Sequence, residues 1–514
     1  MSSMDSHSPP QDAQNAPKQP STALRDPSKL FYQSDGVHRS IIASYWAVIL
    51  LAVPLWWYTT SIERLSLPQS RVYSQAENHL RLPVRICLVA GDQQLAGQLQ
   101  DSIQQHVAKA SERWNGLKID VLQQGQCNSN DGSYSVIPSD KGITLEARQL
   151  SYPLADGSSV SKLVDTLSAL IVPYSAASEQ EHRVAQYSPR YRLSFSLLNE
   201  DAAAGKAIIG WDVEQAINRY IHPILSRLST LHNFTIESQV QFHAPLAFTP
   251  QELDVAYALT SEDLTVFVNS AEWTLSSSAS NDPVLHFVLF IPSSDRRPLK
   301  IANADGSLSA SGAFLLPQWG GIVIHNPTPQ DVPSDTDLPP TDLDQVFSVF
   351  SNQLLALLGV PHLPVGVQRG VSEREALITD WQLDALLRRR ALENAEGAQD
   401  TLRSIVKLVD QIENMPVGED VKGDVQDALA ALDKMYASSR TSLEQAFRYS
   451  AQALTLASRA FFNPGMLALL YFPTEHRVAV YTPLFASALV PLFVAVLKEF
   501  FAWRRQRKLL LANS

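Results

Sequence analysis

Two long stretches of the chain carry no charged side chain, whereas charged and apolar residues are mixed everywhere else. Residues 41–58 form an uncharged run of 18 residues, and residues 478–497 form one of 20. At ~1.5 Å of rise per residue, these runs would reach roughly 27 and 30 Å as helices, which is enough to cross a hydrocarbon core. We therefore predict two transmembrane helices, at residues 41–60 and 478–501.

The first run could instead be a cleaved signal peptide. About 40 residues precede it, its apolar region is longer than that of an ordinary signal peptide, and it ends in the bulky residues Trp56, Trp57 and Tyr58. These features favour an uncleaved anchor.

Basic residues gather on the outer side of both runs, and this bias predicts the orientation. The outer flanks carry Arg25, Lys29, Arg39, Arg504, Arg505, Arg507 and Lys508, against Arg64, Arg71, Arg459 and Arg477 on the inner flanks. Positive charge favours the cytosolic side. Residues 1–40 are therefore predicted to be a disordered cytosolic tail, residues 61–477 to be lumenal and residues 502–514 to be a basic cytosolic tail.

Short apolar runs between the two anchors predict strands. They lie at residues 84–89, 193–198, 264–268, 284–291 and 322–324, and helical patterns separate them at residues 92–114 and 213–228. Such alternation is typical of a mixed α/β domain. We assign residues 61–330 to this domain, and the Pro-rich stretch 331–345 to a linker.

The pattern changes to a helical period in residues 346–477. Ser372–Glu375 has the form of a capping box that would open a helix ending near Glu396, and a second periodic segment covers residues 402–412. A long apolar stripe then runs from Val425 to Phe461, with small polar residues at 438–442 that favour a break. The expected fold is thus a membrane protein with two transmembrane helices flanking a mixed α/β lumenal domain and an antiparallel helical segment.

Composition narrows the classes of partner and of chemistry. The net charge is −11, which excludes a general affinity for nucleic acid. The sequence contains no phosphate-binding or dinucleotide-binding glycine motif, no His-Glu-x-x-His, no Cys-x-x-Cys and no Gly-x-Ser-x-Gly. His232 and His243 are close in sequence, but ordinary surface histidines are the better interpretation than a zinc pair. We expect no catalytic residue, cofactor or metal site.

Two features bear on lumenal chemistry. The only cysteines are Cys87 and Cys127; an oxidising compartment would allow them to pair, but Cys87 lies in an apolar run where a buried free thiol is the commoner outcome. The only N-glycosylation sequon is Asn233-Phe234-Thr235, which would face the glycosylation machinery. Asn233 is therefore the expected glycosylation site.

Four landmarks, in order along the chain, resemble the PIG-S family of GPI transamidase subunits over residues 37–505. The first is Pro54–Thr60, with Glu63-Arg64 and Leu67-Pro68 after it. The next two are Trp319–Ile322 and Thr379–Asp384. The last comprises Phe461–Gly465, Leu469–Pro473, Glu475-His476 and Ala479–Phe485.

The resemblance implies a non-catalytic accessory subunit of the complex that attaches GPI anchors to the C-termini of proproteins in the endoplasmic reticulum. The nucleophile would belong to another subunit. The implied partners are PIG-K, PIG-T, PIG-U and the GPAA-type subunit, together with lipid of the endoplasmic-reticulum membrane.

Two other hypotheses remain open from the sequence. One is a lumenal hydrolase or transferase acting on lipid or glycan, and the other is a lumenal receptor for another cargo. For Trp319-Gly320-Gly321, a tight turn leading into a strand is a better interpretation than a binding site.

Overall fold

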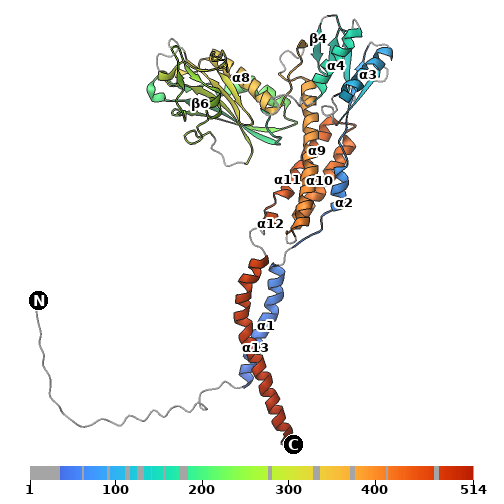
Figure 1. The fold of residues 1–514 in the computed structure, drawn as a ribbon, viewed down its shortest axis with the longest axis vertical. Coiled ribbons are helices and arrows are strands. Elements are labelled where there is room, and N and C mark those ends of the chain that lie inside the picture. The colour runs from blue at the N-terminus through green and yellow to red at the C-terminus, as the bar shows by residue number, and fades with distance from the viewer. Residues whose placement is uncertain are drawn as a thin grey trace, which may run out of the picture. The chain divides into compact units, whose positions relative to one another are not determined.

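The computed structural model describes residues 35–60, 63–89, 93–109, 116–123, 132–140, 142–153, 157–172, 183–275, 281–327, 336–370, 377–412, 415–467 and 474–512 (Figure 1). The chain divides into two compact units. One consists of residues 1–63 and 468–514, and the other of residues 64–467. The predicted disordered tail lies largely outside the described residues.

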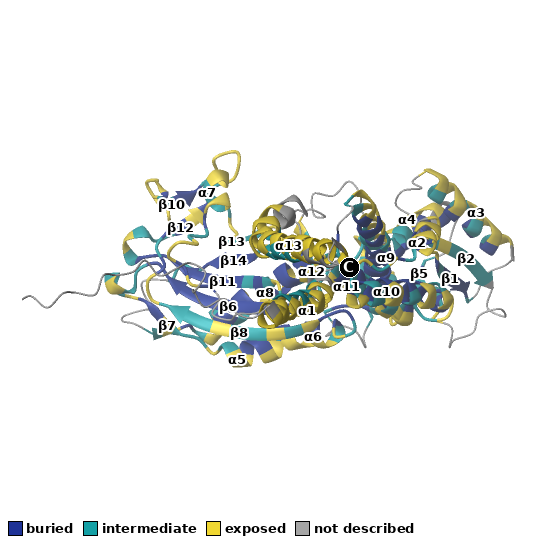
Figure 2. Ribbon diagram, turned by 90° about the horizontal axis from the view of Figure 1, so that it is seen from below, coloured by how far each residue is buried: buried dark blue, intermediate teal, exposed yellow. Residues whose placement is uncertain are grey.

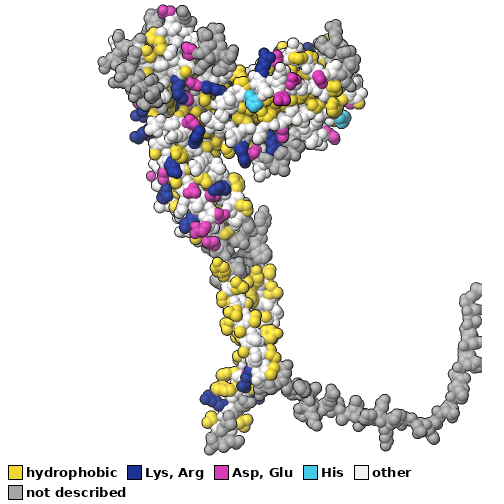
Figure 3. All heavy atoms as spheres, turned by 180° about the vertical axis from the view of Figure 1, so that it is seen from behind, with side chains coloured by type: hydrophobic (Ala, Val, Ile, Leu, Met, Phe, Trp, Pro, Cys, Tyr) yellow, Lys and Arg dark blue, Asp and Glu magenta, His cyan; other side chains and the backbone are white. Residues whose placement is uncertain are grey.

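The terminal unit contains two long apolar helices, α1 (Asp35–Thr60) and α13 (Thr474–Ala512). Trp46 contacts Phe493 edge to face, with ring centroids 5.3 Å apart. Residues 36–56 and 479–509 have the length and composition of membrane spans. The most apolar 18-residue window of each has no buried residue. Apolar side chains accordingly dominate the visible surface of this pair (Figure 3). Helix α13 also continues through most of the predicted basic tail.

Six strands form the first sheet of the larger unit, in the order β16-β4-β5-β3-β1-β2. They are β1 (Leu82–Leu88), β2 (Leu117–Gln123), β3 (Tyr134–Pro138), β4 (Ile143–Glu146), β5 (Gln149–Tyr152) and β16 (Val367–Arg369). Helices α3 (Gln93–Lys109) and α4 (Gly157–Ile171) contribute Leu99, Ile103 and Leu167 to its core. The predicted strand at 84–89 and, over its described part, the predicted helix at 92–114 are confirmed.

The second sheet has the order β13-β14-β11-β6-β8 and is parallel except for β13. Its strands are β6 (Arg190–Asn199), β8 (Asn233–Gln241), β11 (Val284–Ile291), β13 (Ala313–Leu316) and β14 (Gly320–Ile324). The central strands β6, β11 and β14 are buried on both faces (Figure 2). Strands β11 and β14 are nearly continuous apolar runs, as such burial favours, whereas β6 also buries Arg192, Ser194 and Ser196. Three predicted strands, at 193–198, 284–291 and 322–324, are thereby confirmed.

Small strands and short helices surround this sheet. Strands β9 (Gln251–Glu252), β10 (Tyr257–Leu259) and β12 (Leu299–Ile301) form one small sheet, and β7 (Ile208–Gly210) pairs with β15 (Thr336–Asp337). The predicted helix at 213–228 is confirmed as α5 (Val213–Ala216), a π turn at Ile217–Ile221 and α6 (His222–Arg227). Helix α8 (Pro340–Leu358) packs on β14 and begins within the predicted linker.

The predicted strand at 264–268 is wrong. Residues 264–265 are the end of helix α7 (Ser261–Thr265), which begins with a capping box, and residues 266–268 form no strand. The Thr260 side chain accepts a hydrogen bond from the Asp263 backbone N–H, and the Asp263 carboxylate accepts one from Thr260 N at 2.7 Å. Because these bonds satisfy amide groups of the first turn, they favour a helix over the extended conformation that the apolar residues suggested.

Helices α9 (Asp380–Gln411), α10 (Glu419–Ser438) and α11 (Leu443–Phe461) pack against one another, with short α2 (Gln69–Ala76) beside them and α12 (Pro464–Leu467) after them. The predicted break at 438–442 is confirmed: α10 ends at Ser438, and the Ser442 side chain caps α11 by accepting from Gln445 N at 3.3 Å. Leu429, Leu432 and Phe447 are buried within the chain.

The predicted start of the preceding helix is wrong. Ser372–Glu375 lies outside the described residues, and α9 begins only at Asp380, after the non-helical residues 377–379. It then runs without interruption to Gln411, so the segments predicted to end near Glu396 and to cover residues 402–412 form a single helix.

The predicted tight turn at Trp319-Gly320-Gly321 is confirmed, because it joins antiparallel strands β13 and β14. A Cβ atom on Gly320 would lie 1.9 Å from the backbone oxygen of His286 on β11, and one on Gly321 would lie 2.0 Å from the Gln353 side-chain oxygen on α8. Close packing of β14 on β11 therefore requires glycine at 320, where the clash is with backbone, whereas at 321 the Gln353 side chain would have to move.

We expect Gly320→Ala to destabilise the protein by roughly 1–3 kcal/mol or more, because the His286 carbonyl cannot move without disturbing the central strand. Gly97→Ala is the matched control. Its Cβ would meet nothing within 4 Å, and the site is an exposed position of α3. Alanine there should stabilise the helix by about 0.5–1 kcal/mol. Thermal unfolding of the two purified variants measures both effects, and equal melting temperatures would contradict the packing argument.

Candidate functional site

The landmark Thr379–Asp384 forms the first turn of α9, and its local sequence explains why the helix starts there. The Thr379 hydroxyl accepts a hydrogen bond from Gln382 N at 3.4 Å, and the Gln382 side-chain oxygen accepts one from Thr379 N at 3.0 Å. Gln382 Nε2 also donates to Pro361 O at 2.7 Å. This capping box fixes both the start of the helix and the direction of the chain that enters it.

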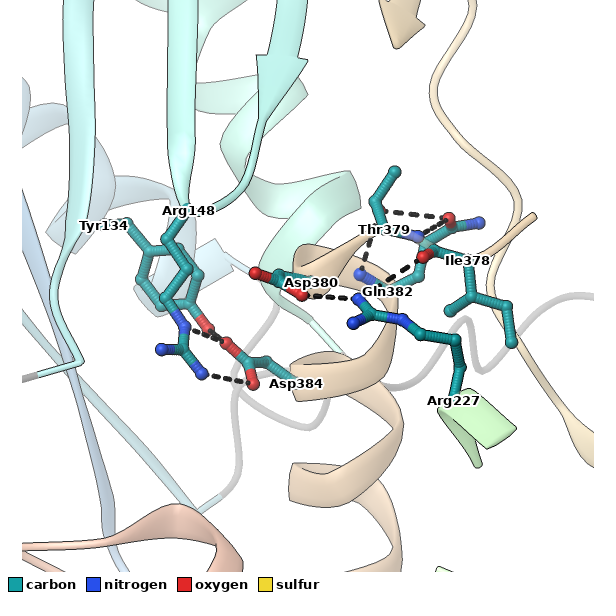
Figure 4. A network of polar contacts seen from close by, with 8 residues as sticks. All are labelled: Tyr134, Arg148, Arg227, Ile378, Thr379, Asp380, Gln382 and Asp384. Carbon is teal, nitrogen blue, oxygen red and sulfur yellow. Dashed lines mark hydrogen bonds and ion pairs between the residues drawn. The ribbon is translucent and has the colours of Figure 1, made fainter. Parts of the chain in front are cut away.

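Asp384 connects α9 to the first sheet (Figure 4). Its carboxylate accepts hydrogen bonds from the Tyr134 hydroxyl at 2.6 Å and from Arg148 Nε and Nη2 at 2.7 and 3.0 Å. Tyr134 begins β3, and Arg148 lies in the turn between β4 and β5. The Asp384 side chain is almost fully buried, whereas that of Arg148 is 44% exposed, so this bidentate pair is shielded from water on the Asp384 side only.

Tyr134 lies at the centre of this network. Burial raises the pKa of its hydroxyl well above the ordinary value, so the group stays protonated and donates to Asp384. Its oxygen also accepts a hydrogen bond from Arg388 Nη2, and its ring centroid lies 4.2 Å from that of Trp381. The hydrogen bond to Asp384 raises the pKa of Arg148, which therefore remains charged.

The same turn of α9 also reaches the region of the second sheet. Asp380 accepts a hydrogen bond from Arg227 Nη2 at the end of α6, and Arg227 also donates to the Ile378 carbonyl at 3.5 Å (Figure 4). Both side chains of this ion pair are about one-third exposed. Residues 378–384 thus contact the first sheet on one side and helix α6 on the other, and this junction is the candidate functional site of the larger unit.

The other landmarks lie at separate places. In the terminal unit, Trp56 of the first landmark contacts Tyr481 and Phe485 of the last, with ring centroids 5.4 and 5.0 Å apart. Phe461–Gly465 covers the end of α11 and the start of α12. Leu469–Pro473 lies outside the described residues.

The expectation of a free thiol at Cys87 is wrong, because this buried residue is disulfide-bonded. The chain's other cysteine is Cys127, which lies outside the described residues. Cys87 lies near the end of β1, and strand pairing brings it beside β2 and β3, whose connection contains Cys127. The pairing of β1 with β2 and β3 thus explains why Cys87 can form a disulfide, and the apolar pattern around Cys87 does not reveal this pairing.

The remaining predicted residues occupy ordinary positions in the second sheet region. His232 is buried rather than on the surface; its Nδ1 lies 2.6 Å from Ser188 O, and burial lowers its pKa to about 4. Asn233 is exposed at the start of edge strand β8. Among the described residues, no group of three or more His, Cys, Asp or Glu side chains is placed to hold a metal ion.

Sequence reasoning identified Thr379–Asp384 but not the residues that it contacts. Asp384 contacts Tyr134 and Arg148, and Asp380 contacts Arg227. Each of these partners precedes its aspartate by more than 150 residues and lies in a segment without a distinguishing motif. The only local signal was the paired Asp380 and Asp384, which lie one helical turn apart and therefore on the same side of α9.

Comparison with known proteins gives a consistent result. A family model described as phosphatidylinositol-glycan biosynthesis class S protein matches residues 43–506. The GPI transamidase component PIG-S homolog of Schizosaccharomyces pombe is 32% identical over 491 residues, covering 92% of this chain and 85% of that protein. The GPI-anchor transamidase component PIGS of Mus musculus is 31% identical, and the alignment covers 90% of this chain and 94% of that protein. That of Homo sapiens is 30% identical, and the alignment covers 90% of this chain and 95% of that protein.

The agreement extends over nearly the whole chain, including both apolar helices and the junction at the start of α9. The family model covers all of the larger unit and most of both apolar helices. This chain belongs to the PIG-S family.

Proposed function

We propose that this chain is a non-catalytic accessory subunit of a GPI transamidase, the complex that attaches GPI anchors to the C-termini of proproteins in the endoplasmic-reticulum lumen. The family membership carries this proposal, because the relatives are named as components of that transamidase. The disulfide at Cys87 supports the non-catalytic part, since a bonded sulfur cannot act as a thiolate nucleophile. The nucleophile then belongs to another subunit.

The proposed partners are the PIG-K, PIG-T, PIG-U and GPAA-type subunits and the lipid around α1 and α13. The exposed apolar surface of these two helices supports a membrane location, because a surface of that kind is unfavourable in water. With more Lys and Arg on the outer flanks of both helices, the two termini face the cytosol and residues 61–477 face the lumen.

This topology predicts N-glycosylation at Asn233, which is exposed and lies on an edge strand beside exposed Thr235. Treatment of the wild-type protein with peptide N-glycosidase should increase its electrophoretic mobility, and Asn233→Gln should remove that shift. Protease added to sealed microsomes should spare residues 61–477 and digest tags placed at either end. Cleavage of the central region in intact microsomes would overturn the proposed orientation.

Replacing both cysteines by serine tests the non-catalytic role. Loss of the bridge should reduce the free energy of unfolding by about 3–4 kcal/mol, because the closed loop is about 40 residues long. GPI attachment in cells, divided by the amount of PIG-K that co-purifies with this chain, should stay close to the wild-type value.

The single variants Cys87→Ser and Cys127→Ser serve as controls, because each should lose the same bridge and show a similar loss of stability. Abolished attachment in a fully assembled complex would contradict the proposal and favour an enzymatic role for this chain. Failure to co-purify PIG-K with the wild-type chain would contradict the accessory-subunit assignment itself.

A further inference from the structure

A cavity of about 380 Å³ lies beside the Asp384 network in the larger unit. The starts of β1 and β3, the first turns of α9 and the turn between α10 and α11 form its walls. Arg85, Arg148, Arg388 and Arg440 contribute to its lining, together with the hydroxyl-bearing residues Tyr134 and Thr230. The lining therefore brings cationic groups and hydrogen-bond donors from separate parts of the chain to one site.

Arg388 is the decisive residue because its charge is buried without a carboxylate partner. The residue is 2% exposed, and among the described residues its hydrogen bonds go to two neutral acceptors, the Ile171 carbonyl and the Tyr134 hydroxyl. Its guanidinium also lies over the Tyr134 ring, 5.3 Å from the centroid. A buried cation with only neutral partners is costly, and an anion beside it would offset that cost.

The carboxylates of the lining do not provide that compensation. Asp384 accepts hydrogen bonds from Tyr134 and Arg148, and Glu444 pairs with Arg448 at 2.7 Å. This leaves Arg388 and Arg440 in the lining without a carboxylate partner among the described residues. An occupant with negative charge is therefore favoured over a neutral or cationic one.

Two further features suit an oxyanion. The Thr230 hydroxyl oxygen is buried and has no hydrogen-bond partner within the described part of the chain, so it is available to donate. Arg440 is exposed at the tip of the α10–α11 turn, and no hydrogen bond or ion pair of its side chain is seen among the described residues. An exposed guanidinium at the mouth of the cavity and a buried guanidinium inside it can contact an anion from two sides.

We propose that this cavity binds a phosphate group, as a monoester or diester. Its charge of −1 to −2 matches the two lining arginines that have no carboxylate partner, and its several oxygens can accept at once from donors on α9, on the α10–α11 turn and at Thr230. Arg388 supplies the buried charge, Arg440 closes the site from the turn and Thr230 donates from the region of the second sheet. The phosphate could belong to a soluble compound or to a lipid headgroup, and both present the same chemistry.

The test uses the full-length protein purified in detergent, with inorganic phosphate and glycerophosphoinositol as probes. Binding is measured from the rise in melting temperature with probe concentration, against chloride at equal ionic strength. Arg440→Ala should weaken the apparent affinity about three- to tenfold, because one charge-assisted contact is lost from an exposed residue. Glu444→Gln should strengthen it about two- to threefold by removing a nearby negative charge.

Arg403→Ala is the matched control, because Arg403 is an exposed arginine of α9 that does not line the cavity. It should bind the probes as the wild type does. Stabilisation by phosphate no greater than by chloride would overturn the proposal. Equal binding by the Arg440→Ala and Arg403→Ala variants would also overturn it, since the anion would then bind elsewhere.

Vesicles of phosphatidylcholine with or without phosphatidylinositol distinguish the two sources of phosphate. If vesicles containing phosphatidylinositol compete with glycerophosphoinositol in the wild type but not in Arg440→Ala, the ligand is a lipid headgroup. If the soluble probes bind and neither kind of vesicle competes, the ligand is a soluble phosphate compound. Both results support a phosphate-binding site in this cavity. Binding of phosphate is a property additional to the accessory role proposed above.

Discussion

Leu432→Asp is expected to destabilise the protein by more than about 4 kcal/mol and to lower its cellular level sharply. Leu432 is 0% exposed in the middle of α10, within the core that α9, α10 and α11 share. The substitution removes apolar packing and places a carboxylate in an apolar core, and each of these changes costs several kcal/mol. Chemical unfolding of the purified protein and its amount in cells are the two measurements.

Gln426→Asp provides the control for this substitution. Gln426 lies on the exposed side of the same helix, so aspartate there should change the stability by less than about 0.5 kcal/mol. A Leu432→Asp protein that unfolds like the wild type but no longer assembles with other subunits would mean that this position faces a partner. Leu443 and Leu454, which are only partly buried, are the better candidates for that role.

Asp384→Ala is expected to cost about 3–5 kcal/mol, because it removes the carboxylate that compensates Arg148 and accepts from the Tyr134 hydroxyl. The buried Tyr134 hydroxyl would lose its acceptor, and the 44% exposed Arg148 would lose its partner. Since the lost contacts join α9 to β3 and to the β4–β5 turn, the first sheet should loosen more than the second. Hydrogen exchange of residues 82–152 compared with residues 190–324 measures this difference directly.

Asp400→Ala is the matched control for the effect of removing an aspartate from α9. Asp400 is exposed and pairs with Arg403 across one helical turn, so its loss should cost no more than about 0.5 kcal/mol. Tyr134→Phe should give an intermediate loss of about 1–3 kcal/mol, because it removes only the hydroxyl. Uniform loosening of both sheets in Asp384→Ala would show that the residue stabilises the whole unit rather than the junction.

The sequence determined the features that depend on neighbouring residues. Uncharged runs near each end specify the apolar helices α1 and α13, because length and composition alone decide whether a helix can cross a bilayer. Nearly continuous apolar segments specified β11 and β14, since strands buried on both faces need few polar positions. The small polar residues at 438–442 predicted the end of α10, where side-chain hydroxyls compete with the helical backbone.

Some local signals pointed in the wrong direction because another local contact was stronger. The apolar residues 264–268 suggested a strand, but the capping box of Thr260 and Asp263 started helix α7. Likewise, Thr379 with Gln382 provides the observed start of α9, whereas an earlier Ser-x-x-Glu pattern had the same form in sequence. A capping motif indicates where a helix can begin, and packing selects among several such places.

Only the tertiary structure decided how distant segments combine. The predicted single α/β domain contains two sheets with separate cores, and β16, from the part predicted to be helical, completes the first of them. The partners of Asp384 and the neutral partners of Arg388 arise from the same long-range pairing. Contacts between residues far apart in the chain decide the strand order, the disulfide and the ion pair of Asp384. A local sequence pattern does not indicate which distant segment provides the contacting residue.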